Sequence, residues 1–232
     1  NWIEINIKME VAIMQPTYFP WIGYFSLIKR VDKFIFLDNV QFSRRSWQQR
    51  NKIADQNKIL WLSVPVIKKN LYNQKISEVK VFDQNFKKKH LNMIKHCYSK
   101  TKYFKNIFPI IENIFNKDFD NLSDWNQYII NKICEYLEIK THIVTASKLN
   151  SSGKKDELLS NICRELKAEK YIAVYGSEEY ISNSNKFKKN NIKVEYFDFK
   201  EIKYSRGKND YISKLSIIDL LFFHGEKSLN YI

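Results

Sequence analysis

The chain has few cysteines, glycines, prolines and histidines, and each shortage excludes a class of protein. Its 232 residues include 3 Cys, 5 Gly, 4 Pro and 4 His. Cys97, Cys134 and Cys163 lie far apart with no CxxC pair, so neither a disulfide framework nor a zinc cluster is encoded. The scarcity of Gly and Pro excludes a fibrous or linker-rich chain. A reduced, cytoplasmic protein is the simplest expectation.

Long apolar runs are also missing, although apolar residues are not. No run approaches the ~20 residues of a membrane span, so no transmembrane segment is expected, and the first residues lack the apolar region of a signal peptide. Hydrophobic residues make up 44% of the chain and aromatic residues 15%, which excludes intrinsic disorder. We expect a single α/β domain over residues 9–232, with residues 1–8 as an extension outside the fold.

Acidic residues are too few to balance the basic ones. The chain has 39 Lys and Arg against 25 Asp and Glu, a formal net charge of +14. This excess favours an anionic partner such as nucleic acid, a nucleotide phosphate or an acidic membrane surface. The alternative is a coding bias towards A and T, because most of the excess is Lys in a chain that is also rich in Asn and Ile.

The order of apolar patterns predicts an α/β fold. Strand-like runs lie at 10–15, 33–38, 59–66, 76–82, 141–147, 170–176 and 192–199. Helical spacing marks 22–31, three helices within 84–138, a helix over about 155–167, and a last helix at 215–225. We therefore predict a mostly parallel, Rossmann-like sheet with flanking helices and an inserted helical layer at about 84–140. The runs 59–66 and 76–82 are expected to be antiparallel neighbours.

The first candidate site is the turn after the first strand, "QPTYFPWIGYF" at 15–25. Ligands of parallel sheets bind outside the carboxyl ends of the strands, and the helix that follows offers free N–H groups to an anion. The rings of the turn would form either a stacking wall or a local hydrophobic plug. The substrate-binding candidates here are Gln15, Tyr18, Trp21, Gly23 and Tyr24.

The second candidate site follows the second strand, in "LDNVQFSRRSWQQRNKI" at 37–53. The planar fork of arginine suits phosphate or carboxylate, and three arginines gather here in a chain where lysine dominates. Asp38 ends the strand and is the candidate general base. The substrate-binding candidates are Gln41, Arg44, Arg45, Trp47, Arg50 and Asn51. An ordinary exposed basic loop is the alternative.

Two later segments carry weaker signals. "SSGKKDELL" at 151–159 has lysines at a predicted helix start, so Lys154 could contact a phosphate, but the P-loop pattern is absent. "VYGSEEY" at 174–180 follows a strand, where Gly176 and Ser177 either contact a ligand or turn the chain.

The histidines and the basic helix around 87–102 indicate little specific chemistry. His90 is expected on a solvated, lysine-rich helix face, with an RNA or lipid surface as the alternative. His224, at the end of the last helix, is a reserve acid/base candidate. No metal site is expected.

Several motifs together resemble the WbqC-like protein family. They are "MQPTYFPWIGYF", "DKFIFLDNVQFSRRSWQQRNKI", "LSVPV", "GKKDELLSNICRELKAEKYIAVYGSEEYI" and "LSIIDLLFFHG". The resemblance implies a role in bacterial O-antigen or other surface-glycan biosynthesis, and one member has been proposed to transfer glycine to an amino sugar. It therefore implies a transferase that N-acylates or aminoacylates a nucleotide-linked amino sugar. The alternative is a non-catalytic module that binds a glycan intermediate or RNA.

In this hypothesis the arginines of 44–50 hold the nucleotide pyrophosphate and aromatic rings stack on base or sugar. The acyl donor stays open between acyl-CoA, aminoacyl-tRNA and an ATP-derived acyl-adenylate, so tRNA or an acyl carrier is a further partner. A looser similarity links the first turn to the nucleotidylyltransferase superfamily. The His-x-Gly-His signature of that superfamily is replaced here by Trp21-Ile22-Gly23-Tyr24, which argues against ATP.

Overall fold

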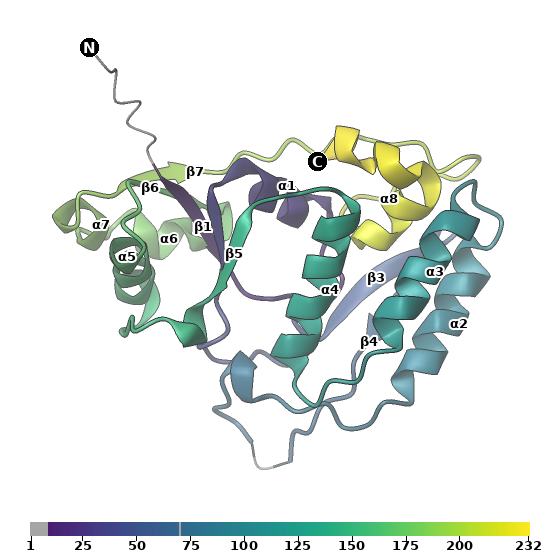
Figure 1. Cartoon of the computed structure of the whole chain (residues 1–232), viewed down its shortest axis with the longest axis horizontal. Helices are drawn as coiled ribbons and strands as arrows, with labels where there is room; N and C mark the ends of the chain where they lie inside the picture. Colours follow the sequence, from purple (N-terminus) through teal and green to yellow (C-terminus); the bar gives the residue numbers. More distant parts are fainter. Residues whose placement is uncertain (1–8, 70) are drawn as a thin grey trace. The chain divides into compact units, whose positions relative to one another are not determined.

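The computed structural model describes residues 9–69 and 71–232, which form two compact units (Figure 1). The first unit comprises 9–14, 27–37 and 141–199, and the second comprises 15–26, 38–140 and 200–232. The expected extension, residues 1–8, lies outside the described residues. The expectation of a single domain over 9–232 stays a prediction.

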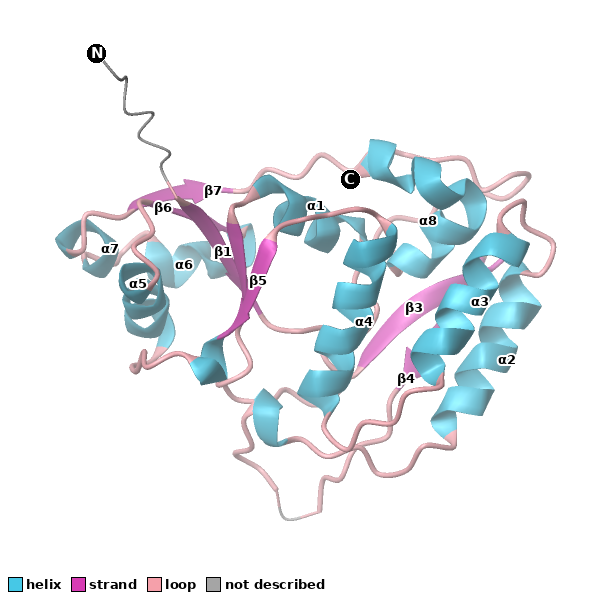
Figure 2. Ribbon diagram, in the orientation of Figure 1, coloured by secondary structure: helices cyan, strands magenta, loops and turns pink. Residues whose placement is uncertain are grey.

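The first unit is built on a five-stranded parallel sheet, which confirms the predicted α/β class. Its strands are β1 (Glu10–Met14), β2 (Lys33–Phe36), β5 (His142–Thr145), β6 (Lys170–Ala173) and β7 (Lys193–Tyr196), in the order β5-β2-β1-β6-β7 (Figure 2). The chain extends the sheet from β1 in one direction and then returns to extend it in the other. This strand order is the Rossmann-like one, in which the crevice lies where the direction reverses.

Helices α5 (Lys155–Glu165), α6 (Glu178–Ile181) and α7 (Lys186–Lys189) also belong to the first unit. The middle strands read as continuous apolar runs because both of their faces are covered. Val11 and Ala12 of β1 and Phe34 and Ile35 of β2 are each 0% exposed. Helix α1 (Ile22–Arg30) contributes residues to both units.

The second unit combines a β-hairpin with helices. The hairpin consists of β3 (Arg50–Asp55) and β4 (Lys58–Ser63), and the helices are α2 (Phe86–Tyr98), α3 (Phe104–Phe115), α4 (Leu122–Tyr136) and α8 (Ile217–His224). Figure 2 shows α2 and α3 side by side, in agreement with their contacts. The three helices predicted within 84–138 are thus confirmed, since their apolar residues recur at the period of a buried helix face.

The ends of two helices follow from side chains of the second unit. Asn121 caps α4 by accepting hydrogen bonds from the N–H groups of Ser123 and Asp124, at 2.7 and 3.2 Å. Gly225 ends α8 with φ at 56°, and any Cβ there would collide with the Tyr103 ring. Glycine is therefore needed at 225 for both its backbone angle and its missing side chain.

Around the hairpin, one predicted strand was wrong and one strand was missed. Residues 76–82 do not form a strand: Ile76–Glu78 is a 3-10 helix, and only isolated bridges follow it. The apolar residues Ile76 and Val79 of this segment are buried, and the 3-10 helix contacts α4; a short apolar pattern cannot distinguish such burial from strand pairing. Conversely, β3 was missed because its sequence, RNKIAD, is mostly polar.

Candidate functional site

The hairpin of the second unit places an arginine over a tryptophan. β3 and β4 are joined at Gln56-Asn57, and Gln56 adopts a positive φ of 50°, as tight hairpin loops commonly require. The resulting register pairs Arg50 with Ser63, so Arg50 shares a face with Trp61, two residues along β4. The guanidinium carbon of Arg50 lies 4.5 Å from the centre of the Trp61 ring. This is a cation–π contact.

Trp47 extends the contact into an aromatic platform. Its ring stacks on that of Trp61, with centroids 5.7 Å apart and planes 29° apart. The two residues are 49% and 43% exposed. Tryptophan is usually mostly buried, so two stacked and exposed indoles beside a guanidinium form a surface suited to a planar base or a sugar ring.

A second arginine–aromatic pair arises from the same loop. The guanidinium carbon of Arg44 lies 5.2 Å from the ring centre of Tyr72, which is 73% exposed, and Arg44 Nη2 donates to the Lys68 carbonyl at 3.0 Å. Gln41 Nε2 approaches the Tyr72 carbonyl oxygen at 3.4 Å. We call Arg44, Trp47, Arg50, Trp61 and Tyr72 the arginine–aromatic surface.

Buried amides hold the loop that carries this surface. Gln48 donates from Nε2 to Gln15 Oε1 at 2.7 Å and accepts from the Ser43 N–H at 3.1 Å. Gln49 accepts at Oε1 from the Arg45 N–H at 3.3 Å, and its Nε2 donates to the Val64 carbonyl at 2.8 Å. Gln15 and Arg45 therefore take part in shaping the loop.

Asn51 and the aromatic turn form the support beneath the hairpin. Asn51 Nδ2 donates to the carbonyls of Tyr18 and Phe19, at 3.1 and 2.7 Å. Tyr18 is 0% exposed, and Tyr24, 2% exposed, donates its hydroxyl to the Gln15 carbonyl. These two rings pack in the core, so we do not place them in the arginine–aromatic surface. Trp21 is partly exposed and Gly23 is buried within α1.

The two acid/base candidates lie in the second unit at different depths. Asp38 is 3% exposed, and its carbonyl accepts the Ser77 N–H at 2.9 Å. His224 is partly exposed, with Nε2 2.9 Å from the Ser205 carbonyl and its ring against Tyr231.

The remaining candidates belong to the first unit. Lys154 is exposed at the N-cap of α5, and Gly176 is exposed after β6. Ser177 is buried and donates its hydroxyl to the Val174 carbonyl at 2.7 Å, as a residue that turns the chain does. These three residues are thus in a different unit from the arginine–aromatic surface.

His90 is buried, so the expectation of a solvated His90 was wrong. Its Nε2 accepts the Ser63 N–H at 3.1 Å, and its Nδ1 lies 2.8 Å from the Tyr18 hydroxyl. Because Nε2 is an acceptor, the neutral ring carries its proton on Nδ1. Burial, and secondly the positive charge of Lys89, lower the pKa of His90 to about 4.

This pKa predicts a loss of stability in mild acid. The folded state resists protonation of His90 while the unfolded chain takes up a proton near pH 6.5, so stability is complete above pH 6.5 and falls between pH 6.5 and 4. The loss should reach up to about 3 kcal/mol. Urea denaturation at several pH values would measure it. His90→Gln, which keeps hydrogen-bonding groups without titrating, should flatten this part of the profile, and an unchanged profile would contradict the assignment.

A buried ion pair was missed in the sequence. Asp219 is 0% exposed and accepts hydrogen bonds from Tyr98 Oη at 2.9 Å, Tyr204 Oη at 2.8 Å and Arg206 Nε at 2.9 Å. Burial, and then the charge of Asp219, raise the pKa of both tyrosines. The sequence marked Asp219 only as part of the motif "LSIIDLLFFHG", because neither its burial nor its pairing with Arg206, Tyr204 and the distant Tyr98 leaves a local pattern.

Two members of the arginine–aromatic surface were also missed. Trp61 lies in a strand whose other exposed residues are unremarkable in sequence, and Tyr72 lies in a loop. The signal for Trp61 was the short Gln56-Asn57 connection, which fixes the register that brings Trp61 beside Arg50. No comparable signal marks Tyr72.

Comparison with known proteins identifies the family. The model of the WbqC-like protein family matches residues 15–231. The chain belongs to this family. Among known relatives of this WbqC-like chain is the uncharacterized protein Rv1507c of Mycobacterium tuberculosis, 32% identical over 225 residues, which cover 96% of this chain and 97% of the relative. No solved structure matches the chain significantly.

The matched range of this WbqC-like chain contains every candidate residue, from Gln15 to His224. Within the described residues, no group of three or more His, Cys, Asp or Glu side chains is arranged to hold a metal ion. In the same part of the chain, no helix combines the length and apolarity that crossing a membrane requires.

Proposed function

We propose that this WbqC-like protein is a transferase that N-acylates or aminoacylates a nucleotide-linked amino sugar in bacterial surface-polysaccharide biosynthesis. The observation that carries the proposal is the arginine–aromatic surface. Two guanidinium groups lie against exposed rings, at 4.5 and 5.2 Å, one in a loop held by buried amides and the other at the start of the strand that follows it. Family membership supports the same direction.

The surface suits the two halves of a nucleotide sugar. Arg44 and Arg50 offer planar donor forks to the pyrophosphate, and an arginine held against an aromatic ring loses little further freedom when it binds. Trp47 and Trp61, which are 49% and 43% exposed, offer aromatic surface to the base or the sugar. The charge of +14 would attract such an anionic substrate from a distance.

The reaction requires a base. The sugar amine, in its neutral form, attacks the acyl carbonyl, a C–N bond forms, the bond to the leaving group breaks, and the amine loses a proton. We propose Asp38 as the proton acceptor, directly or through a water, with His224 in reserve. The free cysteines Cys97, Cys134 and Cys163 support a reducing compartment, and we propose the cytoplasm.

Arg50→Ala is expected to weaken binding of the nucleotide sugar by about 1.5–3 kcal/mol, the range for a hydrogen bond to a charged group. Isothermal titration calorimetry with a panel of UDP- and dTDP-linked amino sugars would measure it. Arg50→Lys should recover only part of the loss, because it restores the charge without the planar fork. Arg164→Ala, at an exposed position in the first unit, is the matched control. An unchanged dissociation constant for Arg50→Ala would reject the phosphate-binding role.

Incubation of the protein with the same sugars and each candidate acyl donor, followed by mass spectrometry of the sugar, tests the transferase itself. A mass increase that matches one acyl or aminoacyl group would support it.

The second candidate function is a non-catalytic module for a glycan intermediate or RNA, and the burial of Asp38 favours it, since a base must reach its substrate. Saturable binding without any product, whichever donor is supplied, would favour this second function.

A further inference from the structure

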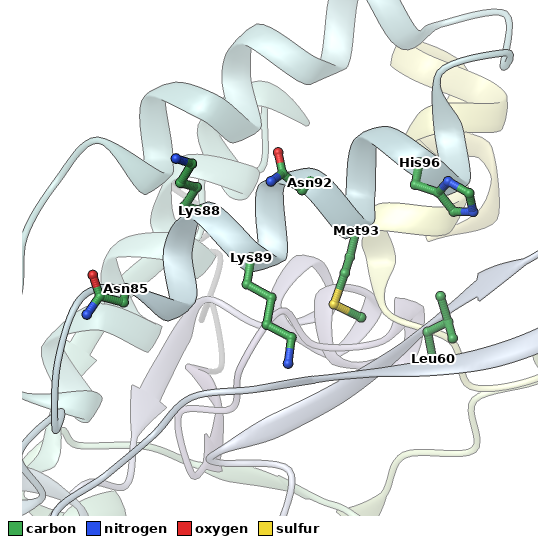
Figure 3. A pocket seen from close by; sticks show the side chains of 7 residues that line it. All are labelled: Leu60, Asn85, Lys88, Lys89, Asn92, Met93 and His96. Carbon is green, nitrogen blue, oxygen red and sulfur yellow. The ribbon is translucent and has the colours of Figure 1, made fainter.

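The second unit contains a basic groove on the face of β4 opposite Trp61. Leu60 and Trp61 are successive strand residues, so their side chains point to opposite faces. The groove has a volume of about 530 Å³ and lies between α2 and β4 (Figure 3). It is lined by Leu60 from β4 and by Asn85, Lys88, Lys89, Asn92, Met93 and His96 from or beside α2. We call it the α2–β4 groove.

Hydrogen bonds and charges fix how α2 runs along β4. His90 accepts the N–H of Ser63, the last residue of β4. His96 lies near the other end, with Nε2 3.4 Å from Oδ2 of Asp55, whose strand partner is Lys58. The groove therefore runs from a lysine-rich end near Ser63 to a histidine end at the hairpin loop. Its middle is apolar, where the side chain of Met93 points down toward β4, which carries Leu60 (Figure 3).

The lysine-rich end carries two charges that no ion pair with a described residue neutralises. Lys87 is buried and paired with Asp118 at 2.7 Å. Lys88 and Lys89 are exposed, and among the described residues neither has an acidic partner within ion-pair distance. Because α2 itself contains no acidic residue, this end of the groove suits an anionic group of a ligand.

The edge of β4 away from β3 carries backbone groups that the hairpin does not use. The register of the hairpin turns the backbone groups of Leu60 and Leu62 toward β3, and those of Ile59, Trp61 and Ser63 away from it. The outward N–H of Ser63 is taken by His90. No hydrogen bond from the described residues reaches the N–H of Ile59 or Trp61. An extended ligand with amide groups could pair with these free groups, as an added strand does.

We infer that the α2–β4 groove binds the phosphopantetheine arm of an acyl donor, supplied as a coenzyme A thioester or on an acyl carrier protein. The arm combines a phosphate, amide groups and methylene segments in one extended chain. Lys88 and Lys89 match the phosphate, the edge of β4 away from β3 matches the amides, and Leu60 and Met93 match the methylenes. The inference rests on the proposed function and selects its donor class.

The transfer then balances without further reactants. The neutral amine of the sugar attacks the thioester carbonyl, and the new C–N bond replaces the C–S bond. The sulfur leaves with the bonding pair, and the proton lost by the nitrogen ends on that sulfur. The products are the N-acylated sugar and the free thiol of the arm.

Titration of the full chain with coenzyme A, phosphopantetheine, ADP and bulk tRNA tests the groove. We expect coenzyme A and phosphopantetheine to bind and ADP, which lacks the arm, to bind at least tenfold more weakly. An acyl carrier protein, with the arm (holo) and without it (apo), distinguishes the carrier from coenzyme A as the source of the arm. If the carrier is the source, the holo form should bind more tightly than both the apo form and coenzyme A. Equal affinity for ADP, or a response to tRNA alone, would overturn the inference.

Variants locate the binding. The double variant Lys88→Ala/Lys89→Ala should raise the Kd for coenzyme A by about 10- to 100-fold, as the loss of charge-assisted contacts implies. The matched control is Lys188→Ala/Lys189→Ala, which removes two exposed lysines of α7 in the first unit and should change nothing. If both double variants lose the same affinity for coenzyme A, the effect comes from the net charge of the protein, and the groove is rejected as the binding site.

The edge of β4 can be tested separately. Ile59→Pro removes an N–H that β3 does not use, so the hairpin should fold, and proline is tolerated at such edge positions. We expect the Kd for coenzyme A to rise about tenfold, while Ile59→Ala, which keeps the N–H, stays near the wild type. If a folded Ile59→Pro variant binds coenzyme A as the wild type does, the proposed pairing of the amides with β4 is rejected.

If amino-sugar nucleotides bind but no pantetheine compound does, this inference fails while the proposed function stands with another donor.

Discussion

Asp219→Asn is expected to destabilise the protein by about 3–5 kcal/mol, the effect of removing one partner from a buried ion pair. Asp219 and Arg206 have side chains 0% and 1% exposed, and their charges lie 2.9 Å apart. Without the carboxylate, Arg206 would hold an uncompensated charge in the core. Such a loss is a large part of the ~5–15 kcal/mol that stabilises a typical protein. Thermal and urea denaturation would measure it.

Two controls make this result specific. Tyr204→Phe removes one hydrogen bond to the Asp219 carboxylate and should cost about 1.5–3 kcal/mol, the range for a hydrogen bond to a charged group. Glu135→Gln breaks the exposed pair with Lys132 and should cost about 0–1 kcal/mol. If Asp219→Asn cost no more than Glu135→Gln, the pair would not be the buried network described above. The network connects α2 and α8 through Tyr98, so loss of packing between these helices is expected in the variant.

Asp38→Asn is expected to lower the rate of sugar acylation by about 10²–10⁴-fold, the contribution of a general base, while nucleotide-sugar binding stays near normal. The amide has the shape of the carboxylate but cannot accept the amine proton. A mass-spectrometric rate assay, with binding measured separately by calorimetry, would separate chemistry from affinity. A fall in kcat with an unchanged dissociation constant is the expected pattern.

The matched control for Asp38→Asn is Asp120→Asn, an exposed position in the same unit. Because Asp38 is buried, the melting temperature must be compared first, so that unfolding is not mistaken for lost chemistry. His224→Gln should have the smaller effect if Asp38 is the base. Full activity in a folded Asp38→Asn would transfer the role to His224 or leave only the binding function.

Much of the fold followed from local sequence patterns. The parallel strands and the helices of 84–138 were predictable because a buried strand and an amphipathic helix leave distinct periods in the sequence. The family could also be inferred from motifs that follow the first two strands. The hairpin strand β3 was not predictable because its sequence is mostly polar, and the 3-10 helix at Ile76–Glu78 was not predictable because its backbone partners, Asp38 and Val40, lie far along the chain.

For the site, the sequence by itself determined which residue types are available: three arginines and a tryptophan after the second strand, in a chain with an excess of positive charge. Only the tertiary structure decided which of them are exposed together. It buried Tyr18, Tyr24 and His90, brought Trp61 against Arg50, and left backbone groups of β4 that the hairpin does not use. The reason is physical: which side chains are buried and which meet across strands depends on the packing of the whole unit, and a local sequence pattern does not record that packing.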